Sequence, residues 1–138
     1  MKLLTFQVRR FWWKSFSKTL PEVEDIDIED EVGDAVVVFF HGEKSDEDPE
    51  QTTRVFRKAL KHIKWVANKR ECKTVVLHSF THLGGETGSP EYAQSFIQDM
   101  SKRLEDTGYV VRSTPFGYFC AWNIDVYGES MAKVFKAI

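Results

Sequence analysis

The sequence predicts an α/β fold: a single domain, with a mixed β-sheet and flanking helices. Segments with the period of a helix alternate with short apolar segments of strand length, roughly in the order β-β-α-β-α-β-β-α. The chain has 138 residues, enough for one domain with a real hydrophobic core. Hydrophobic residues make up 42% of it, which is a globular composition. We therefore expect one domain over residues 1–138.

Five segments read as strands. Asp34–Phe40 is a continuous apolar run, as expected of a strand buried on both faces. Thr74–Ser79 is a second short apolar run, and in Tyr118–Val126 the residues Tyr118, Cys120, Trp122, Ile124 and Val126 alternate onto one face. Lys2–Val8 and Tyr109–Ser113 complete the set. Between the first two strands, Pro21–Gly33 reads as an acidic loop.

The same signal, a polar capping residue followed by proline, predicts the start of two helices. Asp48-Pro49 precedes an apolar stripe that runs from Val55 to Ala67, and Ser89-Pro90 precedes a second stripe. Gly108 is a suitable stop for the second helix. The spacing of Met131, Val134, Phe135 and Ile138 predicts a last short helix.

Several function classes are disfavoured by composition. No run approaches the ~20 apolar residues of a membrane span, and the apolar run at the N-terminus is too short for a secretory signal. Cys72 and Cys120 lie far apart and give no zinc signature, so neither metal nor cofactor is predicted. We expect a cytoplasmic protein that makes no membrane contact.

Positive charge gathers in two segments, although 19 basic and 21 acidic residues nearly balance overall. Residues 9–18 interleave cationic with aromatic side chains, which suits either a base-stacking surface or an edge strand whose tryptophan rings pack on the core. The first predicted helix carries Arg54, Lys58, Lys61 and Lys69 opposite its apolar stripe. That face is either solvated or in contact with phosphates. The overall balance argues against broad wrapping of nucleic acid.

Two polar segments compete for the functional site: His78–Glu86, after a strand, and Thr114–Cys120. Ligands of α/β sheets favour the carboxyl ends of strands. His82 is either a general base or hydrogen-bond donor, or a structural histidine. Cys120 is either a nucleophile or an inert buried thiol, since it shares an apolar strand face. The spacing matches no Ser-His-Asp signature, no GxSxG elbow and no phosphate-binding loop.

The motif "VVLHSFTHLGGETGSPEYA", followed after 20 residues by "TPFGYFCAWNIDVYG", resembles the N-terminal editing domain of archaeal threonyl-tRNA synthetases. The resemblance implies a D-aminoacyl-tRNA deacylase-like fold and a homodimer. The implied activity is hydrolysis of L-serine wrongly esterified to threonine tRNA. Because the sequence ends at Ile138, with no synthetase body after it, we expect a free-standing editing domain.

The resemblance also implies the site. Carried over residue by residue, it assigns substrate binding to Phe80, Thr81 and Glu86 in one loop, and to Pro115–Tyr118 (Pro115, Phe116, Gly117, Tyr118) in the other, with His82 catalytic. In the family, backbone groups and the tRNA's own 2′-hydroxyl place the attacking water, so a conventional nucleophile is not required.

Three positions depart from the family pattern. The family usually has a lysine where this chain has Cys120, and an acidic residue on the C-terminal helix where our alignment places Lys133. Either the catalytic amine has moved to Lys133, with Cys120 making room, or Lys133 is solvated and the site has changed. Phe6–Arg10 replaces short polar residues after the first strand, which leaves the amino-acid specificity open.

Three hypotheses follow. The first is a trans-editing hydrolase that deacylates mischarged aminoacyl-tRNA, Ser-tRNA(Thr) above all, or a D-aminoacyl-tRNA. The second is a non-catalytic module that binds aminoacyl-tRNA or an amino acid. The third is a structural or regulatory partner of a synthetase. The partners implied are the aminoacylated end of the tRNA acceptor, a second copy of the chain, and a threonyl-tRNA synthetase that lacks its own editing domain.

Overall fold

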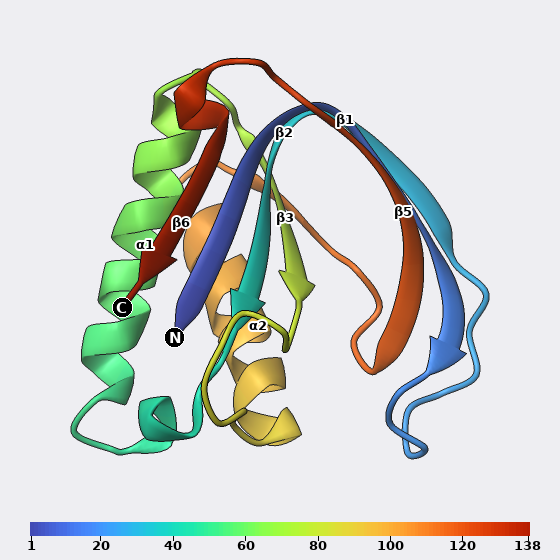
Figure 1. Cartoon of the computed structure of the whole chain (residues 1–138), viewed down its shortest axis with the longest axis vertical. Helices are drawn as coiled ribbons and strands as arrows, with labels where there is room; N and C mark the ends of the chain where they lie inside the picture. The colour runs from blue at the N-terminus through green and yellow to red at the C-terminus, as the bar shows by residue number, and fades with distance from the viewer.

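The computed structural model describes residues 1–138, which form one sheet with two helices (Figure 1). The strands are β1 (Lys2–Lys18), β2 (Glu29–His41), β3 (Thr74–Ser79), β4 (Val110–Ser113), β5 (Tyr118–Val126) and β6 (Lys133–Ala137). The helices are α1 (Thr52–Asn68) and α2 (Pro90–Glu105), with short 3-10 turns at Lys44–Glu47 and Ser130–Ala132.

The sheet is mixed, in the order β4-β3-β2-β1-β5, with β6 also paired to β1. β2, β3 and β4 run parallel, whereas β1 is antiparallel to its three neighbours. β1 is the centre of this arrangement: its N-terminal part pairs with β6 through Lys2–Phe6, and its remainder pairs with β5 from Val8 to Lys18. This arrangement confirms the predicted α/β class with a mixed sheet.

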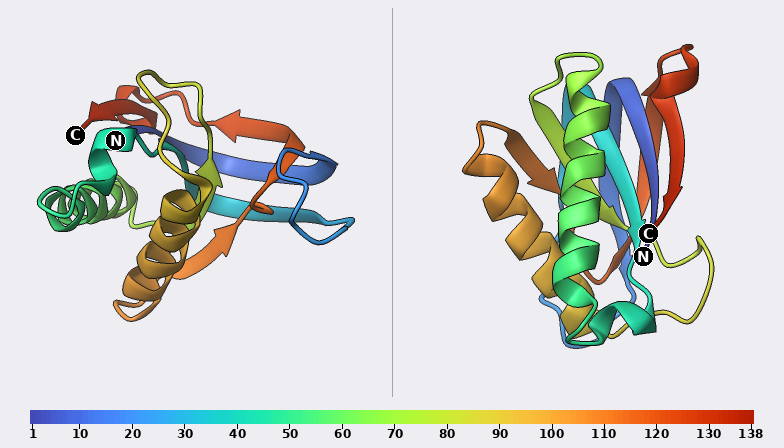
Figure 2. Two further views of the ribbon diagram at one scale, coloured as in Figure 1. Left: turned by 90° about the horizontal axis from the view of Figure 1, so that it is seen from below. Right: turned by 90° about the vertical axis from the view of Figure 1, so that its left-hand side faces the viewer.

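Both helices cover the same face of the sheet (Figure 2, right). They are the crossovers of the parallel strands, α1 between β2 and β3 and α2 between β3 and β4. The main core lies between helices and sheet, where Val36, Val38 and Phe40 of β2 meet Ile63 of α1 and Met100 of α2. Alternate residues of β2 point the other way, as the pleat of a strand requires.

A second, smaller core lies on the opposite face, where β1, β2 and β5 arch over together (Figure 1). It contains Phe11 and Trp13 of β1 with Val37 and Phe39 of β2, all buried. Phe11 and Trp13 therefore pack on the core and form no base-stacking surface. The expected edge strand was wrong, however, because β1 has neighbours on both sides.

Two predictions of secondary structure fail because strand pairing overrides local pattern. β1 runs on to Lys18, and Glu29–Gly33 belongs to β2, so the predicted acidic loop is shortened to residues 21–28. The predicted last helix is wrong: residues 133–137 form β6, which pairs with the N-terminal part of β1. A helix there would have left that edge of β1 unpaired.

The helix starts agree with the sequence to within a turn. Ser89 caps α2, accepting a hydrogen bond from Tyr92 N at 3.2 Å, and Pro90 is its first residue. Residues 49–51 form a turn before α1, in which the Asp48 carboxylate accepts from Glu50 N at 3.0 Å. α1 therefore begins at Thr52, later than the Asp48-Pro49 pair suggested. Neither helix is both long and apolar enough to cross a membrane.

Candidate functional site

A cavity of about 400 Å³ opens at the carboxyl end of β3. One wall comes from residues 78–82, at the end of β3 and just beyond it, and from residues 87–88 with Gly42. The other comes from the turn and strand at 114–120 with Trp122, and from Thr19 and Leu20 beyond β1. α2 contributes Pro90, Ala93 and Ile97, whereas α1 contributes no residue. The two polar segments that compete in the sequence therefore form one cavity rather than two.

Most of the predicted site residues line this cavity. Phe80, Thr81 and His82 lie on one side and Pro115–Tyr118 on the other, with Cys120 beside them on β5. His82 is exposed at the rim, and its ring stands edge-on to Phe80 at 5.1 Å between centroids. An imidazole at a cavity mouth can hydrogen-bond a ligand bound in the cavity.

Glu86 and Lys133 do not line the cavity. The side chain of Glu86 is 81% exposed and lies 3.9 Å from the ammonium of Lys44. Lys133 opens β6 instead of lying on a helix, opposite Phe6 of β1, and its ammonium donates to Tyr127 O at 2.9 Å. The predicted helix that would have turned Lys133 toward the final strand is absent, so this lysine has no contact with the cavity.

His78 is a cavity residue that sequence reasoning did not assign. Its Nδ1 lies 2.7 Å from the hydroxyl of Thr114, and both residues are buried. Its ring packs among Phe39, Phe80 and Trp122. Burial lowers the pKa of His78 to about 4, so the ring is neutral near pH 7. Strand alternation was the available signal, because His78 shares the face of Val76, opposite the helices.

Cys120 is half-buried in the cavity wall, and burial raises the pKa of its thiol. A thiol becomes a nucleophile as the thiolate, which positive neighbours or a helix N-terminus normally stabilise. No neighbouring group lowers the pKa of Cys120, since burial is the one cause of the change. The environment therefore favours the inert thiol over the nucleophile.

Tyr118 forms part of the wall, and its hydroxyl fastens the neighbouring acidic loop. It donates to Glu24 O and accepts from Ile26 N, the latter at 2.9 Å. The turn before it packs on the same loop: Gly117 has a φ of +80°, and a side chain there would collide with Val23. Gly117 and Tyr118 of the cavity wall thus hold the segment 20–28 against the cavity.

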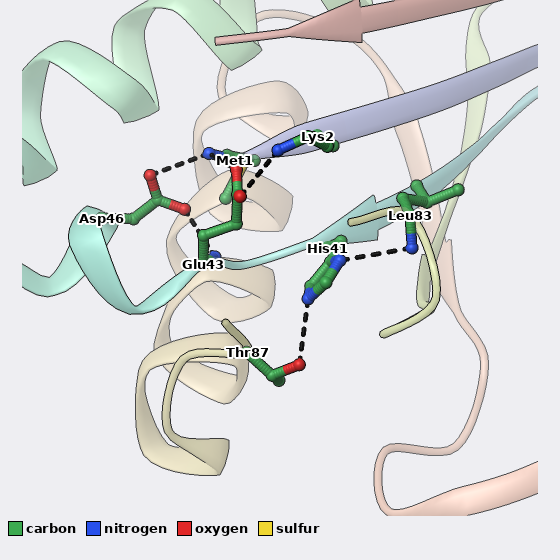
Figure 3. Close-up of polar contacts among 7 residues, drawn as sticks. All are labelled: Met1, Lys2, His41, Glu43, Asp46, Leu83 and Thr87. Carbon is green, nitrogen blue, oxygen red and sulfur yellow. Dashed lines mark hydrogen bonds and ion pairs between the residues drawn. The ribbon is translucent and has the colours of Figure 1, made fainter. Parts of the chain in front are cut away.

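The loop after β3 lies close to an ion pair at the start of the chain, between Lys2 and Glu43 (Figure 3). Lys2 pairs with Glu43 at 2.6 Å, and this pair lies under Gly84 and Gly85, both of positive φ. A Cβ on Gly85 would overlap Glu43 Oε2, and one on Gly84 would lie 2.9 Å from Lys2 Cε. The positive φ favours glycine at both positions, and a Cβ there would in addition displace the ends of the Lys2 and Glu43 side chains.

The fold places the chain in a recognised class. Among solved structures it is similar to the c-Myc DNA Unwinding Element Binding Protein, with a TM-score of 0.64 over 100% of this chain and 99% of that one. At 16% identity this likeness shows the fold alone. The class is that of single-domain α/β proteins of the D-aminoacyl-tRNA deacylase-like fold, as the sequence motifs predict.

The chain belongs to the family of archaea-specific editing domains of threonyl-tRNA synthetase, which it matches over residues 1–138. It is similar to threonine–tRNA ligases of Staphylothermus marinus and Pyrococcus horikoshii, 29% and 30% identical over 142 residues that cover 100% of this chain and 22% of each relative. The ligase of Methanosphaera stadtmanae is 30% identical over 129 residues, 91% of this chain and 20% of that one. The chain thus spans about a fifth of the length of these curated relatives.

Proposed function

We propose that this chain hydrolyses the ester of wrongly charged aminoacyl-tRNA, with Ser-tRNA(Thr) as its substrate. One observation carries the proposal: the two motifs that resemble the editing family, separated by 20 residues in the sequence, line the same cavity. Membership of a synthetase editing family supports an activity on tRNA. The volume of about 400 Å³ is within the range of small-molecule sites and leaves room for an aminoacyl group with part of the terminal nucleoside.

The cavity holds no strongly activated nucleophile. Cys120 is a thiol of raised pKa. The Thr114 hydroxyl does contact an imidazole, but a base whose pKa is about 4 removes protons poorly near pH 7. Direct attack by water, oriented within the cavity and by the tRNA's 2′-hydroxyl, is therefore the mechanism we propose. In it His82 hydrogen-bonds the reacting groups from the rim, while the aromatic walls of Phe80 and Trp122 limit the access of bulk water.

The test is deacylation of a panel of charged tRNAs by the purified protein: Ser-tRNA(Thr), Thr-tRNA(Thr) and a D-aminoacyl-tRNA. We expect Ser-tRNA(Thr) to be hydrolysed fastest and Thr-tRNA(Thr) to be spared. Preference for the D-aminoacyl substrate would assign the alternative deacylase activity. If no charged tRNA loses its amino acid faster than in buffer, the catalytic proposal is wrong.

The second candidate is a non-catalytic module that binds aminoacyl-tRNA or an amino acid. One observation favours it: Cys120 stands on the cavity wall at the position where the family usually has a lysine. The same panel separates the two functions when binding is measured alongside turnover. Tight binding of Ser-tRNA(Thr) without hydrolysis would support the module. If neither binding nor hydrolysis is found, the role of structural or regulatory partner of a synthetase is left.

The proposed partners are a second copy of the chain and a threonyl-tRNA synthetase without its own editing domain, in the cytoplasm. The dimer rests on the family resemblance, because Phe11 and Trp13 are buried within one chain and are not available to an interface. Phe16, 82% exposed, and Phe119, 58% exposed, are apolar side chains that an interface would cover. Sedimentation at micromolar concentration should give a dimer, and a monomer would refute it.

A further inference from the structure

His41, the last residue of β2, contacts the loop that carries His82 through both nitrogens of its ring (Figure 3). Nδ1 accepts from Leu83 N at 3.3 Å, and Nε2 lies 3.0 Å from the Thr87 hydroxyl. The residue itself is fully buried. One imidazole thus connects the sheet to both sides of the Gly84-Gly85-Glu86 turn.

The loop has little else to hold its first half. Phe80 N donates to Phe40 O at 2.9 Å where β3 ends, and Lys44 N donates to Glu86 O at 2.9 Å further along. Between these points, the segment 81–85 makes one hydrogen bond, from Leu83 N to His41. Most of the segment is exposed, including His82. Where His82 lies therefore depends on His41 more than on any other side-chain hydrogen bond.

The two contacts fix the state of the ring. A backbone N–H can only donate, so Nδ1 of His41 must offer its lone pair to Leu83. The proton of the neutral ring is then on Nε2 and is donated to the Thr87 hydroxyl. The tautomer protonated on Nδ1 and the cationic ring both place a hydrogen against the Leu83 amide. Of the three ring states, one is compatible with the observed loop.

The surroundings favour that neutral state. Burial lowers the pKa of His41, and the positive charges of Lys2 and the Met1 amine lower it further, as does His82. Glu43 acts in the opposite direction, but its carboxylate is engaged by Lys2 at 2.6 Å and by the Met1 amine at 2.8 Å. The ring accordingly becomes cationic only at a pH below its usual range.

We propose that His41 is the positioning residue of this site: its neutral, Nε2-protonated ring sets the loop that presents His82, and protonation of the ring releases that loop. The structural part stands on the two hydrogen bonds alone. The effect on catalysis rests on the deacylase function proposed above.

The structural part is tested by NMR on the full chain labelled with ¹⁵N-histidine, with no substrate present. Near pH 7 we expect the Nε2-protonated tautomer for His41, and a Leu83 amide that is protected from exchange. On acidification, protonation of His41 should coincide with loss of that protection. A ring protonated on Nδ1, or one cationic at pH 7, would overturn the proposal, as would a Leu83 amide that stays protected when the ring is charged. None of these readouts depends on activity.

The catalytic part is tested with a graded set of variants. His41→Asn places an amide oxygen near the position of Nδ1 and keeps an acceptor for Leu83 that cannot be protonated. His41→Gln extends toward the position of Nε2 and keeps the contact with Thr87, and His41→Ala keeps neither. We expect kcat to fall about tenfold or more in His41→Ala, consistent with misplacement of a reacting group. In His41→Asn it should fall less, with KM little changed in both.

The pH profile separates the effect of His41, at the end of β2, from that of His82, which lies in the loop itself. The rate of the parent should fall on the acidic side, and in His41→Asn the part of that fall due to His41 should disappear. Thr87→Val, a control that removes only the Nε2 partner, should keep the acidic fall. An unchanged profile in His41→Asn, or equal rates in His41→Ala and the parent, would reject the positioning role. If no variant and no parent hydrolyses any charged tRNA, the deacylase proposal fails, while the NMR result on His41 stands.

Discussion

The Nδ1 atom of His78 lies 2.7 Å from the hydroxyl of Thr114, 36 residues further along the chain. This hydrogen bond joins the end of β3 to the turn that opens the other cavity wall. Because the pair is buried among aromatic rings, its protonation state is coupled to folding as well as to the site.

The first prediction is a loss of stability in mild acid. The pKa of His78 falls from its usual 6.5 to about 4 on folding, so between these values the unfolded chain takes up a proton that the folded chain does not. Stability is full above pH 6.5 and declines as the pH falls toward 4, by roughly 1 kcal/mol per pH unit for this group. Urea denaturation at pH 7, 6 and 5 measures the decline.

A matched variant isolates His78. His78→Phe with Thr114→Val removes the titrating ring and leaves no unpaired hydroxyl. Its stability should depend less on pH than that of the parent, and the residual slope belongs to His41 and His62, whose pKa values burial also lowers. Identical slopes for parent and double variant would show that folding does not lower the pKa of His78.

The second prediction concerns the two residues that replace the family's charged groups. Cys120→Ala should retain most of the deacylation rate, because the thiol has a raised pKa and attacks nothing. Lys133→Ala should also retain it, since its ammonium contacts Tyr127 O outside the cavity. Single-turnover rates on Ser-tRNA(Thr) provide the measurement. Complete inactivation of Cys120→Ala would reinstate the nucleophile, and that of Lys133→Ala would reinstate the displaced amine.

The third prediction uses two glycines. Gly85→Ala places a methyl group against Glu43 at a φ of +29°, and should destabilise the loop by about 1–2 kcal/mol and slow deacylation. Gly128→Ala is the control, because nothing lies within 4 Å of its Cβ position. Adding Glu43→Ala should partly restore Gly85→Ala. If Gly85→Ala and Gly128→Ala have the same free energy of unfolding and the same deacylation rate, the close packing of this loop does not contribute to function.

The fourth prediction is a gentle dependence of tRNA binding on salt. The chain is nearly neutral, and α1, whose cationic face makes no ion pair, contributes no residue to the cavity. We expect a log–log slope below about 6, and no change in it for Lys58→Glu with Lys61→Glu relative to a charge-matched Lys102→Glu with Lys133→Glu. A slope smaller by about two units in the α1 variant alone would instead assign this face to phosphate contact.

Local patterns predict the helices and the parallel strands of this fold well, because caps, prolines and apolar runs are local signals. Ser89-Pro90 marks the start of α2 to the residue. Local patterns fail where pairing with a distant segment determines the secondary structure. The last residues of β1 and the identity of β6 depend on pairing between residues 100 or more positions apart, which no window of sequence reports.

The residues of the candidate site likewise divide into those that local motifs predict and those that only the fold brings together. His82 and Pro115–Tyr118 could be found from the motifs, and the structure places them in one cavity. His78 begins the candidate segment His78–Glu86, but it was given no role of its own because it also falls within the predicted apolar strand Thr74–Ser79. Thr19 and Leu20 were missed because the predicted first strand ended at Val8, so nothing brought them near the turn at Gly117.

The long central strand has a consequence for the order in which this protein is built. β1 is synthesised first, yet β5, which supplies Cys120 and Trp122 to the cavity, begins to pair with it only after 100 further residues have been made. Contacts of such separation form late and slowly, since closing a long loop must precede any gain from the contact. During translation, Phe11 and Trp13 lack their neighbouring strand β5 until that point. A nascent chain stalled before residue 118 is therefore the species most exposed to aggregation, and the one for which a chaperone would matter.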